Sequence, residues 1–342
     1  MLVNSKYVDY YNTVNTEIPI ILDDILIENG DVAPFFDGDV THSLMGRFGN
    51  IMLTNGDENY NLEVKKGDVV RFYITNAANT RTYNFSIPNV QIKLIGGDIG
   101  SYEKEEFIDS IIIAPAERYT IEVYFKNSGE FEMKNINPMN SYVLGKIKVL
   151  NENNDADYSQ DFLSLRENKY IKENIANFKQ YFDKDIDAQI DLSVEMMEIK
   201  MNSMTKSDED KMEWEDTMNM MNTRITNNSM KWVLIDKKSG KENMDIEYKY
   251  KVGDKVKIRI FNNPNSAHPM QHPIHFHGQR FLILEKDGEK NKNLVWKDTV
   301  LIPVGSNVDI LLDVTNSGEW MAHCHIAEHL QSGMMMSFKV EA

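Results

Sequence analysis

Hydrophobic residues in this chain gather in short runs bounded by glycine, asparagine and aspartate. Residues 18–22, 69–74 and 120–125 are such runs, and they are rich in β-branched and aromatic side chains. These side chains favour β-strands. The runs recur at the spacing of a β-sandwich, with turn residues between them. The pattern therefore predicts an all-β protein.

The hydrophobic pattern also repeats within the chain. Residues 66–76 (KGDVVRFYITN) are echoed by residues 252–262 (VGDKVKIRIFN), and residues 115–131 are echoed by residues 303–320. The offset is about 186 to 189 residues in both pairs, and a chance similarity of two turns does not explain a shared offset. At 342 residues the chain is long enough for two full cores. We therefore expect one domain in residues 1–150, a linker in 151–205 and a second domain in 206–342.

The stretch 321–329 (MAHCHIAEH), followed by Met334, contains the only cysteine of the chain and three of its eight histidines. A lone cysteine excludes an intrachain disulfide, so its role depends on its neighbours. A single His-Cys pair would favour a buried cysteine beside surface histidines. Thiolate, imidazole and thioether close together are instead the ligands that copper selects. The full pattern HCHxxxHxxxxM therefore predicts a copper site.

Strand alternation divides this stretch into two faces. In a strand, His323 and His325 point to one face and Cys324 points to the other. One metal ion could then be bound through Cys324 and another through the two histidines. Two peptide units would separate the metals and provide an electron path.

A second histidine motif, HPIHFHG, occupies residues 272–278. His275 and His277 share a face by alternation. His272, set off by Pro273, can face elsewhere and complete the Cys324 site. Six of the eight histidines lie in these two compact motifs, three in each, which scatter by chance would not produce.

Together, HPIHFHG and HCHIAEH followed by GMM resemble the two C-terminal copper motifs of the multicopper oxidases, the family of laccases, ascorbate oxidase and bacterial cuprous oxidases. The flanking residues 296–299 (WKDT) are similar to the family, and residues 23–27 and 46–53 resemble the opening of its middle domain. The resemblance covers nearly the whole chain and implies two cupredoxin-like Greek-key β-sandwich domains, the first without a copper site. It implies a type 1 copper bound by His272, Cys324, His329 and Met334, a type 2 copper ligand in His275, and type 3 copper ligands in His277, His323 and His325.

The resemblance also implies an oxidoreductase. Cu(I) or a phenolic or aromatic substrate would lose single electrons at the type 1 copper. Cys324, His323 and His325 would then have a catalytic role in passing those electrons to a cluster that reduces O2 to water. Many bacterial members have Glu directly after the last histidine, where this chain has Leu330, so its proton donor is not identified.

The family's three-copper cluster needs eight histidines, and this chain supplies four of them. The first half has a single histidine, His42, which we expect to be a surface or packing residue. The chain therefore resembles domains two and three of a three-domain enzyme, with the first domain removed or carried on another chain. Type 2 and type 3 copper would bind only if that partner supplies the missing ligands.

Met270 and His268, two and four residues before His272, are the predicted substrate-binding residues. Their offsets suggest the exposed edge of the type 1 site, and a thioether there suits Cu(I). A methionine-rich stretch from Met196 to Met230 is open to two interpretations. It forms either an amphipathic helix with methionine as core filler or a Cu(I)-attracting surface.

Two other functions remain to be weighed. The missing histidines allow a type 1 copper electron-transfer or copper-binding module without O2 chemistry. A nitrite-reductase-like enzyme with two cupredoxin domains is less well supported, because that family places its type 1 site in the first domain and the first domain here has no cysteine.

Composition excludes some classes of binding partner, but it does not decide where in or outside the cell the protein is located. The formal net charge of −16 argues against nucleic acid or an anionic membrane as a partner. No apolar run approaches the roughly 18 residues of a membrane span. The first residues lack the apolar core of a signal peptide. The family resemblance implies a periplasmic or extracellular location, and the sequence leaves the localisation open.

Overall fold

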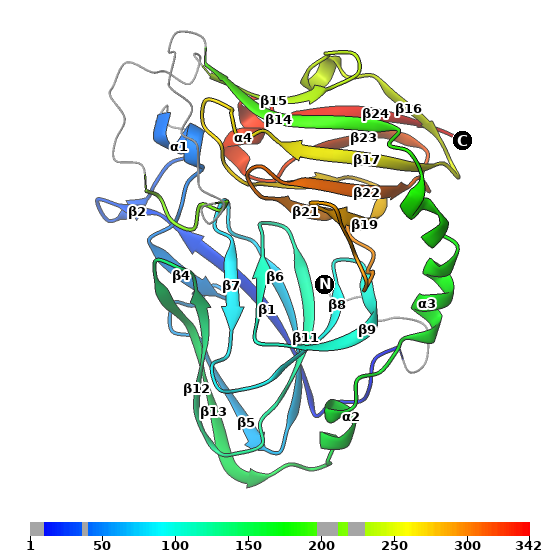
Figure 1. Cartoon of the computed structure of the whole chain (residues 1–342). Coiled ribbons are helices and arrows are strands. Elements are labelled where there is room, and N and C mark those ends of the chain that lie inside the picture. The colour runs from blue at the N-terminus through cyan, green and yellow to red at the C-terminus, as the bar shows by residue number, and fades with distance from the viewer. Residues whose placement is uncertain (1–9, 36–39, 197–210, 218–229) are drawn as a thin grey trace.

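The computed structural model describes residues 10–35, 40–196, 211–217 and 230–342. Strands dominate these residues and form two β-sandwich units, each with a six-stranded sheet and a five-stranded sheet (Figure 1). The expected all-β fold with two cupredoxin-like sandwiches is confirmed. Within the described residues, no helix is both long and apolar enough to cross a membrane.

The first unit has sheet orders β4-β1-β6-β11-β8-β9 and β10-β7-β12-β13-β5. The strands of its six-stranded sheet are β1 (Thr16–Ile25), β4 (Ile51–Thr54), β6 (Val69–Asn76), β8 (Ile92–Gly97), β9 (Gly100–Ile108) and β11 (Arg118–Tyr124). The other sheet contains β5 (Asn61–Lys66), β7 (Tyr83–Ser86), β10 (Ser110–Ile113), β12 (Gly129–Ile136) and β13 (Ser141–Asn153). A small pair, β2 (Ile27–Glu28) and β3 (Asp31–Val32), precedes the helix α1 (Val40–Met45).

The second unit repeats this arrangement strand for strand. Its sheet orders are β15-β14-β17-β22-β19-β20 and β16-β24-β23-β18-β21. The first sheet contains β14 (Ala188–Met196), β15 (Met230–Asp236), β17 (Lys255–Asn262), β19 (Arg280–Lys286), β20 (Glu289–Lys290) and β22 (Asn307–Asp313). The second contains β16 (Tyr248–Lys251), β18 (His272–Phe276), β21 (Thr299–Ile302), β23 (Gly318–Cys324) and β24 (Met335–Glu341), with the short helices η3 (Asn243–Asp245) and α4 (Ala327–Gln331) beside them.

The turns that the repeat predicted have the same hydrogen bonds in both units. The Lys65 backbone N–H donates to the Asp68 carboxylate at 2.8 Å, and that of Lys251 donates to Asp254 at 2.8 Å. The glycine between each pair of residues has a positive φ, a conformation that side chains disfavour. The shared offset in the sequence therefore marks two copies of one sandwich.

The segment between the sandwiches corrects the expected linker. Residues 151–205 include the helices α2 (Ser159–Leu163), α3 (Lys169–Ala176) and η1 (Lys179–Asp183). They also include β14, which pairs with β15 and β17 inside the second unit, so the second sandwich begins well before residue 206. α3 buries Ile171 and Ile175 against hydrophobic residues of β19 and β22. In the described part of this segment, α3 and β14 therefore pack against the second sandwich.

The helix expected in the methionine-rich stretch does not include Met196. This residue ends β14 and pairs with Met230 at the start of β15. The other methionines of the stretch for which both interpretations stay open, Met197, Met201, Met204, Met218, Met220 and Met221, lie outside the described residues. The described residues Met196 and Met230 are therefore register partners at one end of the β14–β15 pair.

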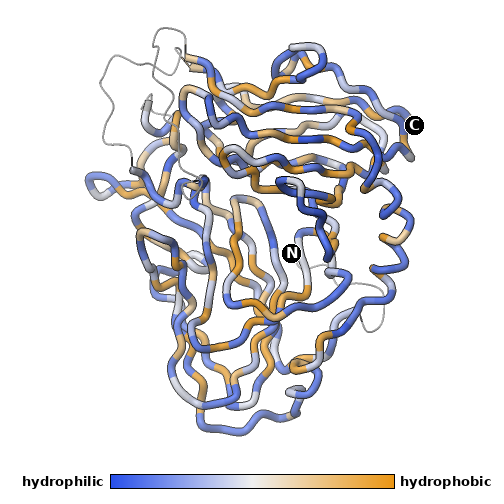
Figure 2. Tube along the Cα trace, viewed as in Figure 1, coloured by the Kyte–Doolittle hydropathy of each residue, from blue (hydrophilic) through white to orange (hydrophobic). Residues whose placement is uncertain are grey.

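Hydrophobic and hydrophilic stretches alternate along the strands of both units (Figure 2). Each sandwich has its own core of buried side chains, as period-2 alternation requires. Leu44, Met45 and Phe48 come from the first half of the sequence but are part of the core of the second unit. The α1 region thus packs against the sandwich that carries the cysteine.

Candidate copper centre

The two sequence motifs lie on neighbouring antiparallel strands, β18 and β23. Ile274 is the register partner of Cys324, and His275 is the partner of His323. His272 and Ile274 are buried on the core face, whereas His275, one residue further, points to the other face with the histidines of the second motif. Ordinary alternation therefore separates His272 from His275, so Pro273 is not needed to explain it.

On the core face, His272, Cys324 and His329 bring three metal-binding atoms together. The Cys324 Sγ lies 3.7 Å from the Nδ1 atoms of both histidines, and these two nitrogens are 3.2 Å apart. Ligand atoms about 2.0–2.3 Å from a metal lie roughly 3.3–4 Å apart in trigonal or tetrahedral geometry. Among the residues that the structure describes, this is the one group of three such ligands within 4.8 Å of one another. Its geometry and its N, N, S donors fit a type 1 copper ion.

The backbone after β23 brings His329 and Met334 back to the cysteine. The chain turns into α4, which carries His329, and then returns along β24. The Met334 N–H donates to the His329 carbonyl at 2.9 Å, and the Cys324 N–H donates to the Met334 carbonyl at 3.0 Å. Met334 is fully buried beside them. This loop therefore brings the three residues that the sequence motif separates, Cys324, His329 and Met334, next to one another.

The surroundings of these ligands keep the histidines neutral in the metal-free protein. Burial lowers the pKa of His272 well below its usual value, and it lowers that of His329 to about 3. Burial also raises the pKa of the Cys324 thiol. A copper ion would stabilise the thiolate, because a coordinating thiol loses its proton to the metal.

Two elements distant in sequence enclose His329. Its Nε2 lies 3.0 Å from the Leu44 carbonyl in α1, to which it donates. The indole of Trp232 stacks on its ring at a centroid distance of 4.0 Å, and the Trp232 N–H donates to the Ser43 carbonyl at 2.8 Å. His329 is thus covered on its free edge and on one face. Nothing in the sequence indicated these contacts, because local spacing does not connect α1 and β15 to α4.

Four other histidines gather on the opposite face of β18 and β23. The ring centroids of His275 and His277 are 4.7 Å apart, and those of His275 and His325 are 6.0 Å apart. The Nε2 atoms of His277 and His323 lie 2.9 Å apart, so one donates to the other in the metal-free protein. Copper binding there would displace that proton. The structure brings together the four predicted cluster histidines as one group, which we call the four-histidine face.

A direct link joins the two groups. The His323 Nδ1 donates to the carbonyl of Cys324 at 2.7 Å. This hydrogen bond leaves the Nε2 of His323 directed at the four-histidine face. Cys324 and its two neighbours therefore span both groups.

Of the two predicted substrate residues, Met270 does not lie at an exposed edge. Met270 is fully buried in the core of the second unit, so its thioether is not at an exposed edge. Its carbonyl accepts a hydrogen bond from the side chain of Asn262 at 2.7 Å, which ties the segment inward. His268 is half-buried, with its ring 6.3 Å from that of Trp232. His42 is half-buried in α1.

Comparison with known proteins identifies a family of copper enzymes, in agreement with the grouping of the cysteine and histidines. Two family models described as multicopper oxidase match residues 7–152 and 197–342. A multicopper oxidase of Staphylococcus haemolyticus is 26% identical over 333 residues, which are 96% of this chain and 60% of that protein. One of Staphylococcus aureus is 25% identical over 299 residues, or 86% of this chain and 53% of that protein. The chain thus spans little more than half the length of these relatives.

Solved structures show the same fold. The multicopper oxidase of Campylobacter jejuni, described as a metallo-oxidase, superposes with a TM-score of 0.68 at 20% identity, over 96% of this chain and 64% of that one. The multicopper oxidase of Aquifex aeolicus superposes with a TM-score of 0.66 at 21% identity, over 95% and 66%. Both family models and the buried His-Cys-His group lead to one conclusion: the chain belongs to the multicopper oxidase family.

Proposed function

We propose that this chain forms the electron-accepting part of a copper oxidase that oxidises a small reductant and reduces O2 to water. The carrying observation is that Cys324 lies in the buried three-ligand group while its two neighbours lie on the four-histidine face. Copper held by His272, Cys324, His329 and Met334 would exchange single electrons with the reductant. The remaining cluster ligands would come from a further cupredoxin domain, in cis or on another chain.

The chain's own residues prepare this exchange. Complete burial of Cys324 and His329 excludes water from the ligands, which limits rearrangement around the bound ion. The hydrogen bond from His329 to Leu44 fixes the tautomer that leaves Nδ1 free for copper. On the other face, the hydrogen bond of His323 to the Cys324 carbonyl fixes its ring in the same way.

Cu(I) suits this site better than a phenol does. A phenol would need an open apolar surface against the type 1 histidine, but Leu44 and Trp232 occupy that position. A metal ion can donate its electron from outside without stacking on His329. Met270 and His268 remain proposed substrate residues, and Met270 would meet Cu(I) only after its surroundings move. The similar Campylobacter jejuni protein is described as a metallo-oxidase.

The test is replacement of Cys324 by serine in copper-loaded protein. The wild-type chain should absorb strongly in the visible region through thiolate-to-copper charge transfer, and Cys324→Ser should abolish that absorption. Met45→Leu, a conservative change in the same core, serves as a control that should retain it. An absorption that survives Cys324→Ser would refute the type 1 assignment.

A second candidate function is an electron-transfer or copper-binding module without O2 chemistry. It is favoured by the number of cluster ligands, because the described residues offer four histidines on the second face. A copper count and exposure of the reduced protein to air separate the two functions. One copper per chain and slow reoxidation, even with a first cupredoxin domain added, would favour the module.

A further inference from the structure

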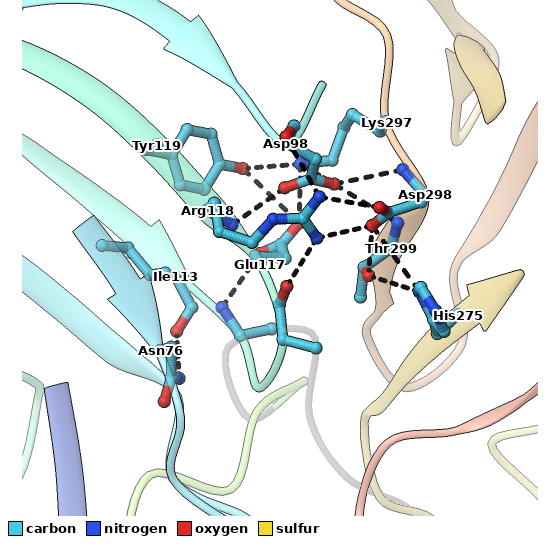
Figure 3. Close-up of polar contacts among 12 residues, drawn as sticks. Asn76, Asp98, Ile113, Glu117, Arg118, Tyr119, His275, Lys297, Asp298 and Thr299 are labelled. Carbon is cyan, nitrogen blue, oxygen red and sulfur yellow. Dashed lines mark hydrogen bonds and ion pairs between the residues drawn. The ribbon is translucent and has the colours of Figure 1, made fainter. Parts of the chain in front are cut away.

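The Nδ1 side of the His275 ring takes part in a chain of hydrogen bonds through Thr299 to Asp298 (Figure 3). Its Nδ1 lies 3.0 Å from the Thr299 Oγ1, and that hydroxyl donates to the Asp298 carboxylate at 2.9 Å. Because the hydroxyl proton is used on Asp298, its oxygen is free to accept from His275. The Asp298 carboxylate is itself 3.6 Å from the same nitrogen. Of the two neutral tautomers of His275, this arrangement favours the one with the proton on Nδ1 and the lone pair on Nε2.

Asp298 is in turn held by the other sandwich. The guanidinium of Arg118, at the start of β11, donates to both carboxylate oxygens, at 2.6 and 2.7 Å. A bidentate pair of this kind fixes the plane of the carboxylate as well as its position. Arg118 also donates to the Asp98 and Ala116 carbonyls, so its own side chain has little freedom.

The backbone around Asp298 is also hydrogen-bonded to the first unit. The buried carboxylate of Asp98 accepts from the N–H groups of Asp298 and Thr299, both at 3.3 Å. It also lies 3.2 Å from the Lys297 ammonium, which pairs equally closely with Glu117. Charged side chains of the first unit therefore bind both the backbone N–H groups and the side chains of the segment 297–299.

We propose that Asp298 is a positioning residue for His275. Acting through Thr299 and held by Arg118, it orients the imidazole so that Nε2 faces the other histidines of the four-histidine face. Contact between the two sandwiches thereby sets the geometry of a copper ligand, although the first unit contributes no ligand from its described residues. The role in copper binding rests on the proposed function, whereas the choice of tautomer does not.

A purely structural ion pair would not have this effect. Arg259 and Asp309 form a comparable bidentate pair, at 2.7 and 2.9 Å, across β17 and β22. No histidine contact of Asp309 is seen among the described residues. This pair therefore offers a matched control, because Asp309→Asn weakens a partly buried pair in the same unit without touching His275.

The first measurement is the tautomer of His275, from imidazole nitrogen NMR of metal-free protein labelled at histidine. The wild-type chain should show the proton on Nδ1. The Asp298→Asn/Thr299→Val double variant should shift the population toward the Nε2–H form, because it loses the hydroxyl bridge and the negative charge. Asp309→Asn should leave the tautomer unchanged. An unchanged tautomer in the double variant would overturn the proposal.

The second measurement is the Cu(II) affinity of the four-histidine face, from chelator competition followed by electron paramagnetic resonance. Loss of a carboxylate behind a ligating histidine costs about 10–100-fold in metal affinity. We expect that loss in Asp298→Asn, a smaller one in Thr299→Val, and none in Asp309→Asn, with the visible absorption of the type 1 copper retained in all three.

The outcomes separate the two proposals. Equal affinities in wild type and Asp298→Asn, or no Cu(II) binding at this face in the wild type, would overturn the positioning role in copper binding. Absence of type 1 absorption in the wild-type protein would instead refute the proposed function, and the tautomer measurement would still decide the role of Asp298.

Discussion

His329 meets three different groups in the folded chain, and together they bury its ring completely. Trp232 covers one face, the Leu44 carbonyl holds the Nε2 proton, and His272 lies next to its Nδ1. A second proton would have to enter beside another imidazole in a dry site. Burial therefore lowers the pKa of His329 to about 3, although a backbone hydrogen bond opposes this shift.

This shift predicts acid sensitivity of the metal-free protein. Between the unfolded value near 6.5 and the folded value, the unfolded chain binds more protons, so stability is lost as the pH falls through that range. At pH 5, His329 alone should cost on the order of 2 kcal/mol of unfolding free energy relative to pH 7. Urea unfolding at pH 7 and pH 5 measures the loss.

The matched variant is His329→Gln. Its amide can still donate toward the Leu44 carbonyl but does not titrate near neutral pH. The drop in stability between pH 7 and pH 5 should be smaller in His329→Gln than in the wild-type protein. Identical drops would show that His329 does not carry the effect.

At the scale of elements, α1 encloses the type 1 site because a glycine lets it approach α4. Gly46 follows α1 with a φ of +73°, and a Cβ there would lie 2.2 Å from the Thr80 Oγ1 and 2.8 Å from the Ile326 Cγ2. Asn79 strengthens the same junction, because its side chain donates to Glu328 in α4 at 2.6 Å. Gly46, Thr80 and Ile326 are therefore closely packed where α1, the loop after β6 and the start of α4 meet.

We expect Gly46→Ala to move α1 away from α4. The control is Gly240→Ala, because Gly240 has a φ of +69° but nothing within 4 Å of its added Cβ. Gly240→Ala should cost about 1 kcal/mol through backbone strain alone, and Gly46→Ala should cost roughly 1–3 kcal/mol more through overpacking. Chemical denaturation measures both.

The same variant tests whether α1 limits access to His329. In copper-loaded protein, bleaching of the visible absorption by hydroquinone should become faster in Gly46→Ala relative to bleaching by Cu(I). Gly240→Ala should keep the wild-type ratio of the two rates. A wild-type ratio in Gly46→Ala, together with the expected loss of stability, would exclude α1 as the barrier to phenols.

At the scale of the whole molecule, buried charges of the described residues connect the first sandwich to the rest of the chain at two places. At one, Lys297 of the second unit pairs with Asp98 and Glu117 of the first. At the other, Arg81 of the first unit pairs with Asp24 and with Glu215, at 2.7 and 2.8 Å. Glu215 belongs to the segment 211–217, whose backbone exchanges two hydrogen bonds with the side chain of Gln271, next to His272.

Removal of the Lys297 charge should therefore weaken the whole molecule. Lys297→Met leaves two buried carboxylates facing each other, which should cost about 3–5 kcal/mol. Lys148→Met is the control, because Lys148 pairs with Glu63 at the surface, where solvent screens the charges. Calorimetry should show a large drop in midpoint for Lys297→Met and little change for Lys148→Met. A small change for Lys297→Met would mean that these charges do not hold the units together.

The sequence by itself determined the strands, the repeat and the grouping of the cysteine and histidines. Alternation on β18 and β23 assigns Cys324 and His272 to one face and His275 and His323 to the opposite face, because side chains in a strand have a period of two. The equal offset of the two copies likewise predicted two equivalent sandwiches, since the same turn residues make the same hydrogen bonds. These features depend on residues close together in the sequence, where the order of residue types sets the direction of side chains and the type of turn.

Tertiary structure alone decided what surrounds the ligands. The sequence placed Met270 at an exposed edge and began the second domain at residue 206, whereas packing buries Met270 and adds β14 to the second sandwich. It gave no indication that Leu44 and Trp232 enclose His329, or that Arg118 holds Asp298 behind His275. Such contacts join residues far apart in the chain, and burial of hydrophobic surface together with pairing of buried charges selects them only once the chain has folded.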